Sequence, residues 1–132
     1  MGKKIDASAA NAKLAKICTG THLTFCSAEP ANYAGISAVK LMSATIVAAS
    51  NAAADGTSGA YTFSTSGNNR RVVIAAQTGM TATAGAPTNC VYACLDDGTT
   101  LLMGTTVTTF SVTSGQSYNS VAITFDDSLI PT

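Results

Sequence analysis

The chain has 132 residues and a formal net charge of zero at pH 7, a size that fits one domain with one core. Lys, Arg, Asp and Glu make up only 11% of the residues, against about 25% in a typical soluble domain. Disordered chains need a high net charge, and membrane-spanning helices need about 18 consecutive apolar residues. Neither feature occurs, so we expect a folded domain that does not enter a membrane.

The composition also predicts a thin core. Ala, Thr, Ser and Gly supply 67 of the 132 residues, whereas Leu, Ile, Val and Phe supply 26. Because a buried Ala removes little apolar surface from water, it adds little stability. We therefore expect a subunit that gains part of its stability from neighbouring copies or partners. A self-sufficient β domain of low stability is the alternative.

Charge is distributed unevenly along the chain. Every basic residue precedes Val72, and only acidic charges follow it. Such a distribution can orient head-to-tail contacts between copies. The candidate partner-binding residues are Lys3, Lys4, Lys13, Lys16, Arg70, Arg71, Asp126 and Asp127. Solvated turn and terminal charges are the alternative interpretation of each one.

The first predicted element is a helix from Asp6 to Ile17. Asp6 or Ser8 can cap its start, alanines fill it, and Gly20 ends it. Its apolar stripe is narrow, so we expect it to pack on a sheet or on a partner. The expected organisation is an N-terminal helical arm of residues 1–20 followed by a β domain of residues 21–132. The polar residues of this segment do not fit a secretory signal, so we expect synthesis in the cytoplasm.

Strands are expected along the rest of the chain. Residues 21–26 alternate apolar and polar side chains, which predicts a half-buried strand. Residues 32–35 are expected to form a loop and residues 51–59 a loop or hairpin end. Residues 37–49 fit a strand or a helix, and their β-branched content favours the strand. The remaining predicted strands span residues 60–64, 70–76, 80–84, 89–95, 99–105, 106–112 and 118–125.

Turn signals about ten residues apart separate these strands, as in sandwiches and small barrels. Residues 60–64 and 70–76 form a predicted hairpin, with Val72 and Ile74 on one face and Val73 and Ala75 on the other. The expected fold class is mainly β: a single-domain β-sandwich or small barrel of about seven to eight strands with a short N-terminal helix.

Few residues suggest chemistry. Cys18, Cys26, Cys90 and Cys94 are expected to be buried thiols, because their spacing does not match common zinc knuckles. His22 is expected to be structural rather than the base of a Cys nucleophile. The Asp96-Asp97-Gly98 stretch is typical of a turn, with a cation or two-carboxylate site as the alternative. No cofactor and no nucleic acid is expected, and the sequence indicates a non-enzymatic protein.

Several stretches resemble small β-rich virion structural proteins of tailed bacteriophages and prophages. The resemblance rests on Arg71 to Gly79, Asp97 to Leu102, Val112 to Gly115 and Asp127 to Pro131, with Cys26 to Pro30 and Tyr33 near the front. It implies a multi-copy capsid decoration or cement protein, located on the virion. Its partners would be the major capsid protein and other copies of itself.

The expected function is therefore to bind the outer shell and stabilise capsomer joints through many modest interfaces. The basic N-terminal lysines would meet an acidic shell surface. The alternative is a tail- or fibre-associated β domain that binds another adhesin or a host surface glycan. The sequence has no Trp and four Tyr residues, which limits the aromatic surface available for stacking on sugars.

Overall fold

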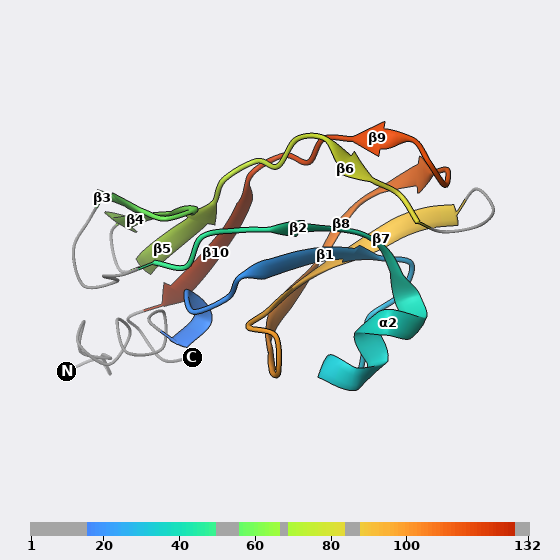
Figure 1. The fold of residues 1–132 in the computed structure, drawn as a ribbon. Coiled ribbons are helices and arrows are strands. Elements are labelled where there is room, and N and C mark those ends of the chain that lie inside the picture. Colours follow the sequence, from blue (N-terminus) through green and yellow to red (C-terminus); the bar gives the residue numbers. More distant parts are fainter. Residues whose placement is uncertain (1–15, 50–55, 67–68, 84–87, 129–132) are drawn as a thin grey trace. The chain divides into compact units, whose positions relative to one another are not determined.

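The computed structural model describes residues 16–49, 56–66, 69–83 and 88–128. Contacts along the chain define two compact units. Unit 1 contains residues 1–19, 47–76 and 121–132, and unit 2 contains residues 20–46 and 77–120. Figure 1 shows that strands predominate in both.

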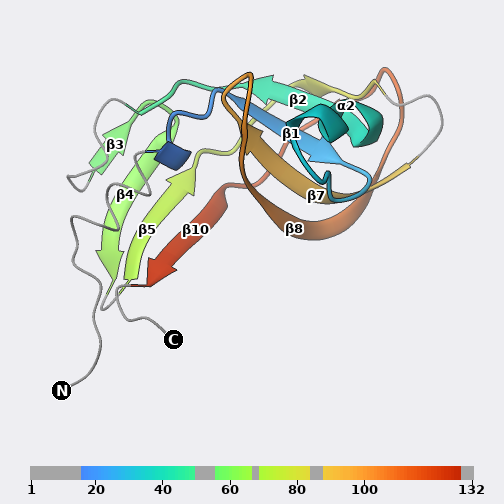
Figure 2. The same cartoon turned by 90° about the horizontal axis from the view of Figure 1, so that it is seen from below.

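Unit 1 is a four-stranded antiparallel sheet with the order β10-β5-β4-β3. Its strands are β3 (Gly56–Ser58), β4 (Tyr61–Ser66), β5 (Asn69–Ile74) and β10 (Ile123–Ser128). Figure 2 shows β4, β5 and β10 side by side. Alternate residues of the two middle strands are almost fully buried, namely Tyr61, Phe63, Val72 and Ile74. These residues form the apolar side of the sheet, as the period of two requires.

Unit 2 contains a second four-stranded antiparallel sheet, ordered β2-β1-β7-β8. Its strands are β1 (His22–Cys26), β2 (Lys40–Thr45), β7 (Thr88–Asp96) and β8 (Leu101–Val112). The short strands β6 (Met80–Thr81) and β9 (Ser117–Tyr118) pair with each other. Between β1 and β2 lie a 3-10 turn, η1 (Tyr33–Gly35), and one helical turn, α2 (Ile36–Val39). Strand β1 therefore occupies an interior position of its sheet.

The two faces of this sheet differ in chemistry. Leu23, Phe25, Ala93 and Leu95 lie on one face and are buried. The opposite face carries His22, Thr24 and Cys26 of β1 beside the polar and thiol residues of β7. Ile36 of α2 is buried against Cys26 and Cys94, with Val39 packed at the edge of this cluster. Helix α2 thus covers one end of the polar face and leaves the other end open.

Two glycines permit close packing in unit 2. A Cβ atom on Gly20 would overlap the side chain of Leu95, and one on Gly104 would overlap the ring of Tyr92. Neither glycine has a positive φ angle, so the requirement is for space rather than for a left-handed backbone. Gly104 therefore lets the Tyr92 ring lie against β8.

The predicted mainly β fold is confirmed, with antiparallel sheets and short helical segments. Within the described residues the sheets keep open edges, so they do not form a closed barrel. The described residues hold ten strands instead of seven to eight, because β3, β6 and β9 are only two or three residues long. The predicted hairpin is confirmed by β4 and β5, which pair from Tyr61↔Ile74 to Ser66↔Asn69.

Other sequence predictions were wrong in detail. The segment 37–49 begins with the last residues of α2 and then forms β2, so the helix and the strand both occur. The predicted strands 99–105 and 106–112 are one continuous strand, β8, because no turn interrupts the Thr-rich run. The predicted strand 118–125 is split between β9 and β10, which pair with different strands. Residues 51–59 were expected to form a loop or hairpin end. In their described part, residues 56–58 form β3, which pairs with β4 as the first strand of a hairpin.

The amino-terminal prediction lies almost wholly outside the described residues. Only Lys16 and Ile17 of the expected helix are described, and both are helical. The organisation into an arm of residues 1–20 and a domain of residues 21–132 stays a prediction.

Candidate functional site

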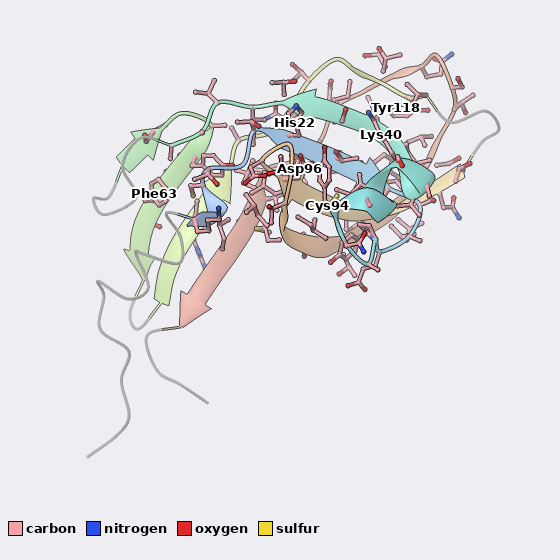
Figure 3. All side chains as sticks on the ribbon, turned by 60° about the horizontal axis from the view of Figure 1, so that its bottom comes forward. His22, Lys40, Phe63, Cys94, Asp96 and Tyr118 are labelled. Atoms are coloured by element: carbon pink, nitrogen blue, oxygen red, sulfur yellow. The ribbon has the colours of Figure 1, made fainter. Side chains whose placement is uncertain are left out.

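The open end of the polar face in unit 2 forms a hollow of about 390 Å³. Strands β1, β2 and β7 form its base, and η1 with α2 forms one wall. Figure 3 shows His22, Asp96 and Lys40 in this part of the molecule. The lining residues are His22, Thr24, Tyr33, Ala34, Ile36, Ser37, Lys40, Ser43 and Asp96. This is the candidate functional site.

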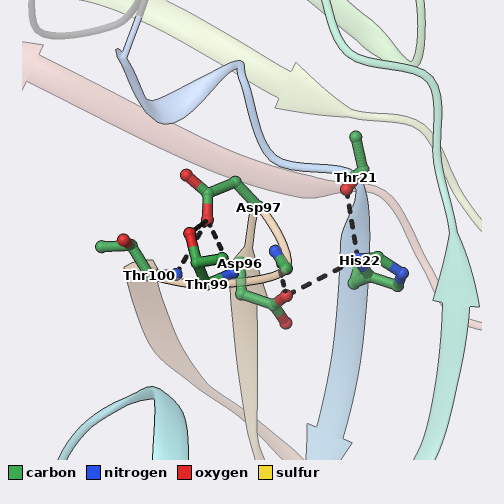
Figure 4. A network of polar contacts seen from close by, with 7 residues as sticks. Thr21, His22, Asp96, Asp97, Thr99 and Thr100 are labelled. Carbon is green, nitrogen blue, oxygen red and sulfur yellow. Dashed lines mark hydrogen bonds and ion pairs between the residues drawn. The ribbon is translucent and has the colours of Figure 1, made fainter.

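Strand register brings His22 and Asp96 together. The two residues are directly paired across β1 and β7. His22 Nδ1 lies 3.6 Å from Asp96 Oδ1 and 3.1 Å from Thr21 Oγ1 (Figure 4). The His22 side chain is 46% exposed whereas that of Asp96 is 6% exposed. Both contacts therefore engage one ring nitrogen, and Nε2 is left for other partners.

The buried Asp96 carboxylate is held in place by the turn that follows it. Gly98 N–H donates to Asp96 Oδ1 at 2.9 Å. Asp97 Oδ1 accepts from the Thr99 and Thr100 N–H groups and from the Thr99 hydroxyl, at 2.8–3.0 Å. Gly98 has a φ of 95°, which favours glycine. The turn interpretation of Asp96-Asp97-Gly98 is confirmed, and Asp96 additionally faces the hollow.

The wall of the hollow is built by local capping. Asn32 precedes η1, and its side-chain Oδ1 accepts from Gly35 N–H at 3.0 Å. This cap fixes the turn that presents Tyr33, whose side chain is 40% exposed. Ser37 follows on the exposed side of α2, while Ile36 turns toward the sheet. Lys40 begins β2 and is also exposed.

The covered end of the same face contains a pair of thiols. Cys26 Sγ lies 3.8 Å from Cys94 Sγ, and both residues are at most 1% exposed. The shared hydrogen bond, together with burial, raises the pKa of Cys26, and the same bond lowers the pKa of Cys94. Cys18 and Cys90 are buried free thiols as well. The prediction that all four cysteines are buried is confirmed.

The arrangement supports binding more directly than catalysis. A His–Asp pair can orient a general base, but such a base needs a nucleophile within hydrogen-bond reach. The Thr21 hydroxyl and Asp96 both contact Nδ1 of His22, and the Cys26 thiol contacts Cys94. Among the described residues no hydroxyl or thiol is hydrogen-bonded to Nε2, the nitrogen that would activate a nucleophile when Nδ1 faces a carboxylate. Within the described residues no cluster of three or more His, Cys, Asp or Glu side chains fits a metal ion. The hollow instead combines one cation, one anion, several hydroxyls and an aromatic ring.

The residues predicted to bind partners are not among the lining residues named for the hollow. Lys3, Lys4 and Lys13 lie outside the described residues, and Lys16 is exposed at the start of the described chain. The register of β5 and β10 sets Arg71 opposite Asp126 and Arg70 opposite Asp127. The structure thus brings these four residues together within one sheet, and their role in partner binding stays a prediction.

Sequence reasoning considered His22 and Asp96 separately and missed their pairing. It did not select Tyr33, Ser37, Lys40 or Ser43 as a group, because nothing in their spacing indicates that η1, α2 and β2 surround one hollow. The alternation of His22 with Leu23 was the available signal, since it placed His22 on the more polar face. Its pairing with Asp96 depends on a long-range strand register.

Comparison of the chain with protein-family models, with curated proteins and with solved structures finds no match. No helix in the described ranges has the length and apolar character needed to cross a membrane.

Proposed function

We propose that the chain is a non-enzymatic structural protein of a bacteriophage particle, a decoration or cement protein that binds the outer shell of the capsid. The observation that carries the proposal is strand β8. It is twelve residues long, contains no charged residue and no proline, and lies at the edge of its sheet. Monomeric proteins usually protect such edges with lysines, prolines, short strands or bulges, and of these β8 has only a bulge, between Thr106 and Phe110.

Strand β8 has features suited to pairing with another chain. Gly104, Thr106, Thr108, Thr109 and Ser111 are exposed along it, so hydroxyls predominate on its surface. In the described part of the chain it pairs with β7 alone. An added strand gains main-chain hydrogen bonds from an unpaired edge. A second copy of this chain is the occupant we assign to it, because an uncharged edge lets two copies approach without repulsion.

The edge also contains a register change that defines where pairing can occur. Cys90 pairs with Phe110 and Tyr92 with Thr106, so β8 has additional residues between these two pairs. Bulges of this kind bend a strand and interrupt its ladder. The regular parts of the edge are therefore the stretches on either side of residues 107–109.

We assign attachment to the shell to the basic N-terminal end of the chain. Stabilisation of the whole particle would come from many bound copies. The low charge and the resemblance to phage virion proteins support this assignment. Opposite charge on a capsid surface would give electrostatic complementarity. Each copy needs only a modest interface, since a multi-copy shell repeats it.

The test is co-sedimentation with capsids assembled from the major capsid protein of the same phage. Reversing the charge of Lys3, Lys4, Lys13 and Lys16 is expected to release the protein at moderate salt without unfolding it. Replacing Thr106 and Ser111 by Lys, one on each side of the irregular stretch, is expected to reduce self-association, while Thr100→Lys, outside the edge strand, leaves it unchanged. Undiminished occupancy of the charge-reversed protein would contradict the assigned contact.

The tail or fibre location is the second candidate, and the hollow beside Tyr33 favours it because it offers an aromatic ring next to polar groups. Copy number in purified particles distinguishes the two. A shell protein is present in many copies, and a tail protein in few. Failure to find the chain in either part of the particle would contradict both candidates.

A further inference from the structure

We propose that the hollow in unit 2 binds an acidic saccharide, a pyranose ring that carries a carboxylate. The inference goes beyond attachment to a capsid and holds for a shell or a tail location. It depends on the side chains of four elements, β1, β2, β7 and the η1–α2 segment, which all belong to one unit.

The size of the hollow fits a small ligand. Its volume of about 390 Å³ lies near the lower end of the range of about 300–1,000 Å³ typical of ligand sites. Its base contains the buried residues Thr24 and Asp96, and its rim contains the exposed residues Tyr33 and Lys40. A ligand of one or two sugar rings would contact the base and the rim together.

The charged side chains that line the hollow favour a ligand with a single negatively charged group. Lys40 is the one Lys or Arg among the lining residues, and among the described residues it has no carboxylate partner. The Asp96 carboxylate is already engaged by Gly98 N–H and faces the His22 ring. The unmatched positive charge of Lys40 is therefore complementary to a ligand carboxylate, through a charge-assisted hydrogen bond.

The uncharged groups fit sugar hydroxyls. Each hydroxyl of a sugar donates one hydrogen bond and accepts others, and Ser37 and Ser43 can do the same. Asp96 supplies an acceptor, because its contacts with Gly98 N–H and with His22 both use Oδ1. His22 Nε2 is a further polar atom on the exposed side of its ring. Donors and acceptors thus lie together, as a polyol requires.

The apolar groups fit the C–H face of the same ligand. Tyr33 presents a partly exposed ring held by the Asn32 cap, and Ala34 and Ile36 continue this apolar wall. Aromatic rings supply a large, rigid contact surface with a polar tip. Inorganic phosphate fits less well, because it offers no apolar face to this wall.

The experiment uses the purified full chain and two matched ligands, methyl β-D-glucuronide and methyl β-D-glucoside, which differ by the carboxylate. Ligand-observed NMR and calorimetric titration are expected to show the glucuronide binding about tenfold more tightly than the glucoside, from one charge-assisted hydrogen bond. Lys40→Gln is expected to remove that difference. Lys16→Gln, an exposed lysine of unit 1, is the matched control and is expected to keep it.

A second variant separates the ring contact from the charge contact. Tyr33→Ala is expected to weaken both glycosides by about three- to tenfold, and Tyr33→Phe to retain binding. Tyr33 and Lys40 are both exposed, so circular dichroism of their variants should show unchanged folding. Equal binding of the two glycosides, tighter binding of inorganic phosphate, or no binding of either glycoside would overturn the proposal. None of these measurements involves particles, so the capsid proposal is tested independently.

Discussion

The two sheets use the same antiparallel pairing but bury their strands differently. In unit 1, β4 alternates: Tyr61 and Phe63 are buried, and Thr62 between them is exposed. In unit 2, all residues of β1 from Leu23 to Cys26 are buried. The difference arises because α2 covers part of the second face of the unit 2 sheet.

This comparison indicates where function can reside. A sheet with one apolar and one solvated face needs only hydrophobic alternation. A strand enclosed on both sides must accommodate its polar residues, and His22 and Thr24 are those residues in β1. The incomplete cover over them creates the hollow. Unit 1 contains no comparable enclosed polar strand within its described residues.

The largest expected effect tests the difference in burial directly. Phe63→Ala in β4 and Phe25→Ala in β1 should each lower the free energy of unfolding by about 3–5 kcal/mol, since both rings are 2% exposed. On the opposite faces, Thr62→Ala should cost less than about 0.5 kcal/mol. Thr24→Ala, at a buried position, should cost about 1–2 kcal/mol. Urea denaturation measures all four.

The informative quantity is the contrast between the two threonines. If Thr24→Ala and Thr62→Ala had the same small effect, β1 would behave like a half-exposed strand. The proposed distinction between the units would then be wrong.

The next effect tests the packing of Tyr92 over β8. Gly104→Ala should lower the free energy of unfolding by about 1–3 kcal/mol, because the new methyl overlaps the Tyr92 ring. Gly35→Ala is the matched control. The nearest atom to a Cβ there is Asn32 Oδ1 at 3.6 Å, so its effect should be small. Combining Gly104→Ala with Tyr92→Ala should give less than the sum of the single effects, and strict additivity would contradict the contact.

The smallest effect concerns pH. Burial raises the pKa of the Cys18 thiol from 9.0 to about 12. Between these values the unfolded chain loses a proton that the folded chain retains, so stability falls as pH rises through this range. Burial also raises the pKa of Tyr61, which acts in the same direction. Urea denaturation at pH 8 to 11 should therefore show a decline that is shallower in Cys18→Ala. Identical slopes would contradict this assignment.

The sequence predicted the parts of the fold that depend on neighbouring residues. The β4–β5 hairpin followed from two alternating runs separated by a Gly-Asn connection, and β1 from alternation alone. The single turn of α2 was missed, because Ile36 to Val39 is too short to show a helical period. Strand β9 was merged with β10 because the residues between Tyr118 and Ile123 include no Gly or Pro to mark the break.

The candidate site was beyond local reasoning. His22 and Asp96 meet through the register of β1 with β7, and Lys40 and Ser43 are added by the register of β1 with β2. Neither register can be derived from the composition of the strands, because several polar residues would satisfy the same alternation. The local feature that sequence did indicate, the Asp-Asp-Gly turn, proved to be the part that orients Asp96.

The strand order has a consequence for the newly synthesised chain. Strand β1 needs β7, and β5 needs β10, so each sheet must wait for partners made much later on the ribosome. Among the described strands, only the β1–β2, β3–β4 and β4–β5 ladders can form before β7 is made, and a two-stranded ribbon such as β1–β2 is marginally stable in water on its own. The nascent polypeptide is therefore exposed to misassociation until its last strands emerge, and contacts so distant in sequence make slow folding the expected behaviour.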